Sequence, residues 1–204
     1  MKKTIFILAL FITCNLIGQN KWRFGSTISF DNNLSSEYLI TDANINGYSI
    51  DYDQFNFTFG FIAEYKLNKK LFLETGIEYS NKDFTGIYNC ATCFPNGLWI
   101  YSKEKIEQRF IQIPILFKYY LIDQKIKLSI KTGLKNNFSI ENKLDNKKYY
   151  LEGIIGSEIE YRIINNWNLG LGFNYNKSLT NLYNDENFDF KTNSFYLKVI
   201  YGIK

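Results

Sequence analysis

The fold is decided by the stretch Phe55-Asn-Phe-Thr-Phe-Gly-Phe-Ile-Ala-Glu-Tyr-Lys66, in which every second side chain from Phe55 to Tyr65 is apolar. A helix would scatter these six side chains around its axis, whereas a strand places all of them on one face. The side chains between them are mostly polar or small. Residues 55–66 are therefore predicted to form a β-strand with one apolar face.

The same alternation recurs in seven other segments of the chain. Their apolar faces cover residues 22–30, 71–79, 111–119, 126–134, 151–161, 167–175 and 195–203. The connections alternate in length: those at 31–54, 81–105, 135–149 and 177–191 are long, and those at 67–69, 122–124 and 163–166 are short. Alternating long loops and tight turns are typical of a barrel in the outer membrane, with the turns in the periplasm. We predict an all-β fold, an eight-stranded antiparallel up-and-down transmembrane β-barrel.

Aromatic side chains gather at both ends of the predicted apolar faces. At the ends next to the short turns they are Trp22, Tyr65, Tyr119, Tyr161, Trp167 and Tyr201, and at the other ends they are Phe30, Phe55, Tyr79, Tyr175 and Phe195. Aromatic rings favour the membrane–water interface, so two such girdles indicate a membrane-spanning barrel. The alternative is a soluble barrel of the lipocalin type, which would turn this bulky face inward, where eight strands leave little room.

The N-terminus has the pattern of an export signal. Lys2 and Lys3 precede an apolar run over residues 4–12, which is too short to span a bilayer. We expect residues 1–19 to be a signal peptide and residues 20–204 to be the barrel domain, located in the cell outer membrane. A lipoprotein signal at Cys14 is an alternative that its flanking residues fit poorly.

Composition excludes several classes of function. The chain contains no histidine, which removes the commonest general base and the commonest metal ligand. A formal net charge of +4 is too small to indicate a nucleic-acid partner. Glu158 and Glu160 could in principle act as an acid–base pair, but two carboxylates on one strand face are better explained as ion-pair members. We expect no enzyme activity, no catalytic residues, no cofactor and no metal.

Charged residues occupy the face that would point into the barrel. The predicted charge network of the lumen consists of Arg23, Glu64, Lys66, Glu74, Glu78, Lys118, Lys127, Lys131, Glu152, Glu158, Glu160, Arg162 and Lys198. Charges in so narrow a space must pair, because an isolated buried charge is very costly. We expect a salt-bridge network that plugs the barrel; a proton or small-ion path, or a narrow channel for small solutes, is the alternative.

One cysteine pair lies in the longest predicted loop. Cys90 and Cys93 form a C-x-x-C motif that has no second pair to complete a zinc site. In an exported protein this spacing suits a local disulfide, with free thiols or a redox pair as alternatives.

The stretch Phe110-Ile-Gln-Ile-Pro-Ile-Leu-Phe-Lys-Tyr-Tyr120 resembles a strand of the PorT-like outer-membrane barrel family of Bacteroidota. The resemblance implies a barrel in the outer membrane, without shared catalytic residues, and it allows an accessory role in envelope secretion or assembly. Pro114 cannot donate to a ladder, so we expect a bulge there, which leaves the facing of Glu107 and Gln108 open. The expected partners are outer-membrane lipid and an envelope protein or surface ligand bound through the long loops, with the barrel itself a monomer.

Overall fold

The computed structural model describes residues 21–34, 38–40, 47–89, 102–142, 147–183 and 188–203. The predicted signal peptide and the predicted disulfide of Cys90 and Cys93 lie outside these residues. In the part of the chain that is described, no helix is long and apolar enough to cross a bilayer.

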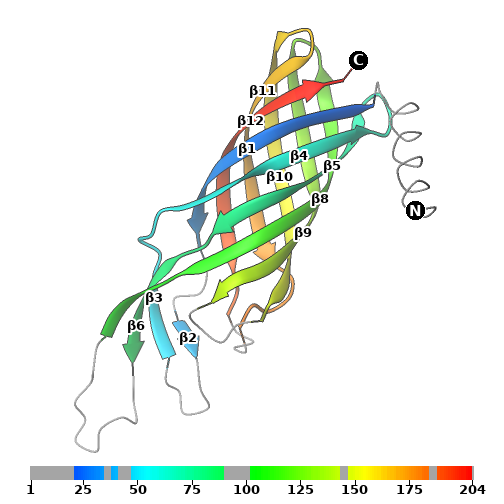
Figure 1. Cartoon of the computed structure of the whole chain (residues 1–204). Helices are drawn as coiled ribbons and strands as arrows, with labels where there is room; N and C mark the ends of the chain where they lie inside the picture. The colour runs from blue at the N-terminus through cyan, green and yellow to red at the C-terminus, as the bar shows by residue number, and fades with distance from the viewer. Residues whose placement is uncertain are drawn as a thin grey trace, which may run out of the picture.

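Eight strands form the predicted closed antiparallel barrel (Figure 1). They are β1 (Trp22–Asn33), β4 (Asn56–Lys66), β5 (Leu71–Asn81), β8 (Gln108–Asp123), β9 (Ile126–Asn142), β10 (Tyr149–Ile164), β11 (Trp167–Ser178) and β12 (Lys191–Gly202). Each strand pairs with its neighbour in this order, and β1 pairs with β12 from Arg23–Gly202 to Asn33–Thr192. This last pairing closes the sheet, so no barrel strand has a free edge.

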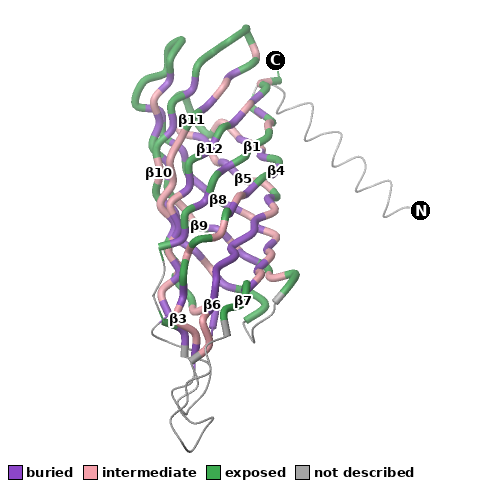
Figure 2. Tube along the Cα trace, turned by 90° about the vertical axis from the view of Figure 1, so that its left-hand side faces the viewer, coloured by how far each residue is buried: buried purple, intermediate pink, exposed green. Residues whose placement is uncertain are grey.

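The two faces of the barrel wall are those that the alternation predicts. Figure 2 shows buried and exposed positions alternating along the barrel strands. The outward face is apolar, with Phe61 77% exposed and Ile77 62% exposed, as suits contact with lipid. On this outward face, near the short turns, the rings of Trp22 and Tyr65 pack with their centroids 4.9 Å apart. The rings of Trp167 and Tyr201 pack there at 5.0 Å.

A second sheet stands at the end opposite the short turns (Figure 1). Its strands pair in the order β2 (Tyr38–Ile40), β3 (Gly47–Asp51), β6 (Phe84–Asn89) and β7 (Ser102–Ile106). The expectation that 31–54 and 81–105 are loops throughout was therefore wrong. Barrel strands are also longer than expected, since β9 continues to Asn142.

An apolar cluster joins the second sheet to the rim of the barrel. Its members are Leu39, Ile50, Phe84, Ile106, Phe110, Tyr150, Leu182, Tyr183, Phe188 and Phe190. They come from β2, β3, β6, β7, β8, β10 and the connection before β12. We call the second sheet together with this cluster the outer cap.

The predicted bulge at Pro114 is absent. Pairing between β5 and β8 is interrupted between Thr75–Ile115 and Glu78–Gln112, but it resumes in the same register. Proline removes one donor without adding a residue, and the Thr75 hydroxyl donates to the Pro114 carbonyl at 2.8 Å. The register shifts of β8 against β9 lie at its two ends instead.

Candidate functional site in the barrel interior

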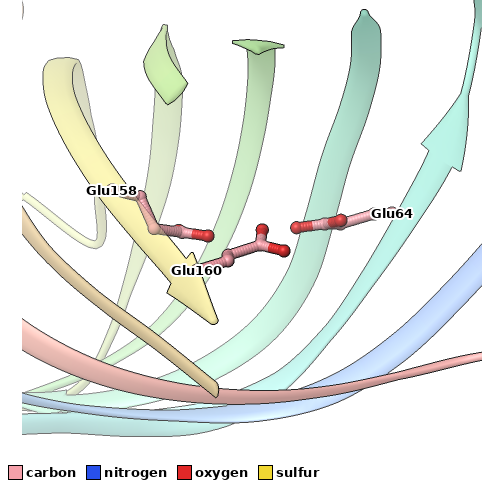
Figure 3. A group of neighbouring side chains, drawn as sticks. All are labelled: Glu64, Glu158 and Glu160. Atoms are coloured by element: carbon pink, nitrogen blue, oxygen red, sulfur yellow. The ribbon is translucent and has the colours of Figure 1, made fainter. Parts of the chain in front are cut away.

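Three carboxylates converge in the lumen near the turn end. Glu64 comes from β4, and Glu158 and Glu160 come from β10, so the groups approach from different sides of the barrel (Figure 3). One oxygen from each lies within 4.8 Å of the others, and all three residues are buried. Alternation along β10 places Glu158 and Glu160 on the inward face. Three negative charges this close require cations among them.

Lys118 of β8 lies at the centre of the three carboxylates. Its Nζ is 2.6 Å from Glu158 Oε1 and 3.1 Å from Glu64 Oε1, and it also contacts Glu160. Arg23 of β1 lies 2.5 Å from Glu64 and 2.9 Å from Glu160. The carboxylate oxygens that could bind a metal ion thus contact nitrogen atoms of Lys118 and Arg23 instead.

The ion pairs extend further to Lys198, Glu74 and Lys131. Lys198 of β12 lies 3.0 Å from Glu64, 2.6 Å from Glu158 and 2.8 Å from Glu74. Lys131 of β9 lies 3.2 Å from Glu74. We call these eight residues the inner network: Arg23, Glu64, Glu74, Lys118, Lys131, Glu158, Glu160 and Lys198. It contains four acids and four bases and balances its own charge.

Two tyrosine hydroxyls donate hydrogen bonds to carboxylates of the inner network, in addition to its ion pairs. The Tyr120 hydroxyl donates to Glu160 at 2.6 Å, and the Tyr196 hydroxyl donates to Glu158 at 2.7 Å. A buried ion pair offsets its desolvation only when such additional bonds satisfy the remaining lone pairs. The inner network meets this requirement at the two β10 carboxylates.

Two further ion pairs lie between the inner network and the outer cap. Lys82, just after β5, contacts Glu152 and donates to the Tyr150 hydroxyl at 2.8 Å, while Lys135 lies 3.4 Å from Glu78. Burial lowers the pKa of the Lys82 ammonium, and the Glu152 carboxylate beside it opposes that shift. We call Glu78, Lys82, Lys135 and Glu152 the outer pairs.

Little free space remains between the inner network and the outer pairs. A cavity of about 30 Å³ lies there, lined among others by Glu74, Glu78, Lys131 and Lys135. Such a volume is enough for about two water molecules. Side chains therefore fill most of the lumen between these two groups.

Comparison with known proteins agrees with this architecture. The family model described as "Outer membrane protein beta-barrel domain" matches residues 17–151. The chain belongs to this outer-membrane β-barrel family. No curated protein sequence matches it. The protein is thus a small outer-membrane β-barrel protein.

Two solved structures illustrate the fold that this member of the family shares. Neisserial surface protein A is 12% identical and superposes with a TM-score of 0.57, covering 89% of this chain and 96% of that one. OprG from Pseudomonas aeruginosa is 10% identical with a TM-score of 0.56, covering 90% and 94%. At such identities the likeness concerns the fold alone.

The predicted lumen charges divide into those that the structure brings together and those that it does not. All eight residues of the inner network, and Glu78 and Glu152 of the outer pairs, were predicted from alternation. Lys66 is only half-buried and Arg162 is exposed, so these two do not join the network, and Lys127 pairs instead with Asp123 at 3.5 Å. These three residues lie where the inward faces of their strands reach the open turn end of the barrel.

Lys82 and Lys135 were missed, although both form buried ion pairs. They lie just beyond the predicted ends of their strands. Extending the inward positions by steps of two would have found them, because Lys135 follows Gly133 and Lys82 follows Ser80 on the same face.

Proposed function

We propose that this protein is a plugged, non-conducting barrel with a structural or interaction role in the outer membrane. The observation that carries the proposal is the inner network, in which four acids and four bases neutralise one another across the lumen. The outer pairs and the outer cap lie above it toward the cell surface.

An ion passing through this interior would have to separate several buried ion pairs. Opposite charges about 4 Å apart attract by about 4 kcal/mol at an effective dielectric constant near 20. Lys118 and Lys198 each contact three carboxylates, so displacing either one breaks several attractions together. Permeation along this route therefore has a high barrier.

A planar lipid bilayer tests the proposal directly. The full chain, shown to be folded by its gel mobility, should produce no stepwise current under conditions in which a known porin does. Stable unit conductance steps from the folded protein would overturn the plug and favour the narrow-channel or ion-path alternative.

The outer cap is the part that we propose for partner binding. It presents a hydrogen-bonded sheet beyond the barrel, and in it the Tyr48 hydroxyl donates to Glu104 at 3.0 Å. Burial, together with this bond, raises the pKa of Tyr48 to about 12. An ordered sheet offers a fixed surface to an envelope protein or a surface ligand.

The PorT-like resemblance of β8 favours an envelope secretion or assembly role as the form this interaction takes. We propose a monomeric barrel, held in outer-membrane lipid and exported by its N-terminal signal, that associates with other envelope proteins. Cross-linking in native membranes followed by purification tests this. A specific envelope partner that is lost when the outer cap is altered supports the role, and recovery of the barrel alone contradicts it.

We propose no catalytic role. The chain has no histidine, and the two carboxylates that could form an acid–base pair, Glu158 and Glu160, are both engaged by Lys118. The disulfide of Cys90 and Cys93 remains a prediction. Mass spectrometry of non-reduced peptides checks it, and two free thiols in native cells would contradict it.

A further inference from the structure

A basic pocket opens at the turn end of the barrel, below the inner network. Its volume is about 340 Å³. Its lining includes five basic side chains and one acidic one: Lys21, Arg23, Lys66, Lys127, Arg162 and Asp123. We call this the mouth pocket. The short turns of outer-membrane barrels face the periplasm, so the pocket opens on that side.

The charge of the mouth pocket is not balanced by the interior above it. Arg23 already belongs to the inner network, whose four acids and four bases neutralise one another. The other four bases of the pocket face Asp123 as its one acid, which leaves an excess of three positive charges. Among the residues that the structure describes, Lys66 and Arg162 form no ion pair.

Two buried polar atoms in the lining also lack hydrogen-bond partners within the described chain. They are Arg23 Nε and Asn168 Oδ1, on residues that are 9% and 6% exposed. Buried polar groups are nearly always bonded, so these two atoms are available to a ligand that enters the pocket. Arg23 Nε–H is a hydrogen-bond donor. A flip of the Asn168 side-chain amide exchanges its oxygen and nitrogen and places a donor at the same point.

The geometry points to binding of a phosphate group in the mouth pocket. A phosphate carries up to two negative charges and several acceptor oxygens, so it can bond cations that come from several strands at once. Lys66 from β4 and Arg162 from β10 supply cations from two strands, and a cleft lined mainly by one sign of charge concentrates their field. The group can belong to a soluble phosphate or to a phospholipid headgroup of the periplasmic leaflet. The site adjoins the proposed plug at Arg23, but its unbalanced charges lie outside the inner network, so conductance through the lumen would leave them unchanged.

The first experiment uses the full folded chain in a maltoside detergent, which contains no phosphate. Inorganic phosphate is titrated in by calorimetry at low ionic strength. In parallel, phosphatidylglycerol or phosphatidylcholine is added to the micelles, and native mass spectrometry counts the lipids retained. Binding of inorganic phosphate assigns a soluble source, whereas selective retention of phosphatidylglycerol without it assigns the headgroup.

The deciding variant is Lys66→Gln/Arg162→Gln, which removes two charges of the pocket without touching the inner network. Its matched control is Lys69→Gln/Lys70→Gln, which removes two exposed charges at the same barrel end but outside the pocket. Losing two charge-assisted contacts should weaken phosphate binding by at least about tenfold, with no change in the control. The charge-preserving Lys66→Arg/Arg162→Lys should retain most of the affinity.

Gel mobility confirms that each variant is folded, and the exposed single change Arg162→Gln serves if the double variant is not. Binding that falls in the pocket variant and persists in the control supports the site, whichever phosphate source is bound. Failure of both phosphate and phosphatidylglycerol to bind the wild type overturns it. An equal loss in the two double variants also overturns it, because binding would then reflect overall charge.

Discussion

At the scale of single residues, the interior is packed so closely that one added methyl group would disturb it. Gly172 on β11 lies directly opposite Tyr196 on β12. A Cβ added to Gly172 would overlap the Tyr196 phenol, which donates the hydrogen bond to Glu158, and would also lie too close to the Ser157 carbonyl oxygen. Glycine at this position therefore makes room for a tyrosine that donates a hydrogen bond to the inner network.

Gly172→Ala should consequently displace the Tyr196 ring and lower stability. Overpacking of this kind costs about 1–3 kcal/mol in the free energy of unfolding. Urea unfolding of the protein in lipid vesicles, followed by tryptophan fluorescence, measures the loss. Gly153→Ala is the control, since the atoms nearest to a Cβ there belong to Leu179, at an ordinary contact distance of 3.5 Å, and the change should be nearly neutral. Equal effects of both changes would show that close packing around Gly172 is not what requires the glycine.

Glu74→Ala tests the inner network by removing the carboxylate that pairs with Lys131 and Lys198. Removing this carboxylate leaves excess positive charge in the lumen, and breaking a buried pair costs about 3–5 kcal/mol. The same urea experiment should show the loss, without any gain of enzymatic activity. Glu141→Ala, at an exposed position on β9, is the matched control. A loss below about 1 kcal/mol for Glu74→Ala would mean that the lumen is hydrated and the charges act independently.

At the scale of elements, the outer cap should respond separately from the barrel. Phe84 of β6 is fully buried in the apolar cluster that joins the cap to the rim. Phe84→Ala removes that contact and should raise hydrogen exchange in β3, β6 and β7, while β1 and β12 keep their protection. Ile87→Ala, at a half-buried position on the same strand, should change exchange much less. Uniform loss of protection over all strands would contradict an independent cap.

The eight barrel strands could be predicted from the sequence because each buries or exposes a whole face, which produces a period of two. The strands of the cap could not. β2 is three residues long, too short for a period to appear, and β3 meets β6 through Tyr48 opposite Tyr88, a contact between distant parts of the chain. Their pairing is decided by tertiary contacts rather than by local pattern.

The alternation predicts which residues line the candidate site, but not which of them form ion pairs. Alternation placed Arg23 and Glu160 inside the barrel, yet nothing in the sequence says that they meet. They meet because the closed sheet brings β1 and β10 to face each other across the lumen, where their atoms lie 2.9 Å apart. Strand number and stagger determine such contacts, and neither can be read from one strand.

At the scale of the whole molecule, closure of the sheet predicts resistance to detergent. With every barrel strand paired on both sides, an unboiled sample in dodecyl sulfate should stay folded and migrate differently from a boiled one. The protein should also fractionate with the outer membrane. A soluble periplasmic pool that shows one gel mobility before and after boiling would contradict a membrane-embedded barrel.

The pairing of β1 with β12 also sets the order in which the molecule can be made. The first barrel strand to leave the ribosome finds its second neighbour only when Lys191–Gly202 has arrived, at the far end of the chain. Until then β1 and β11 each present an unsatisfied row of amides and carbonyls, which hydrocarbon cannot hydrate. A chain that stops before Lys191 should therefore be an aggregation-prone substrate for chaperones and proteases rather than a smaller barrel. We therefore expect β1 and β11 to need shielding until Lys191–Gly202 has been made and exported.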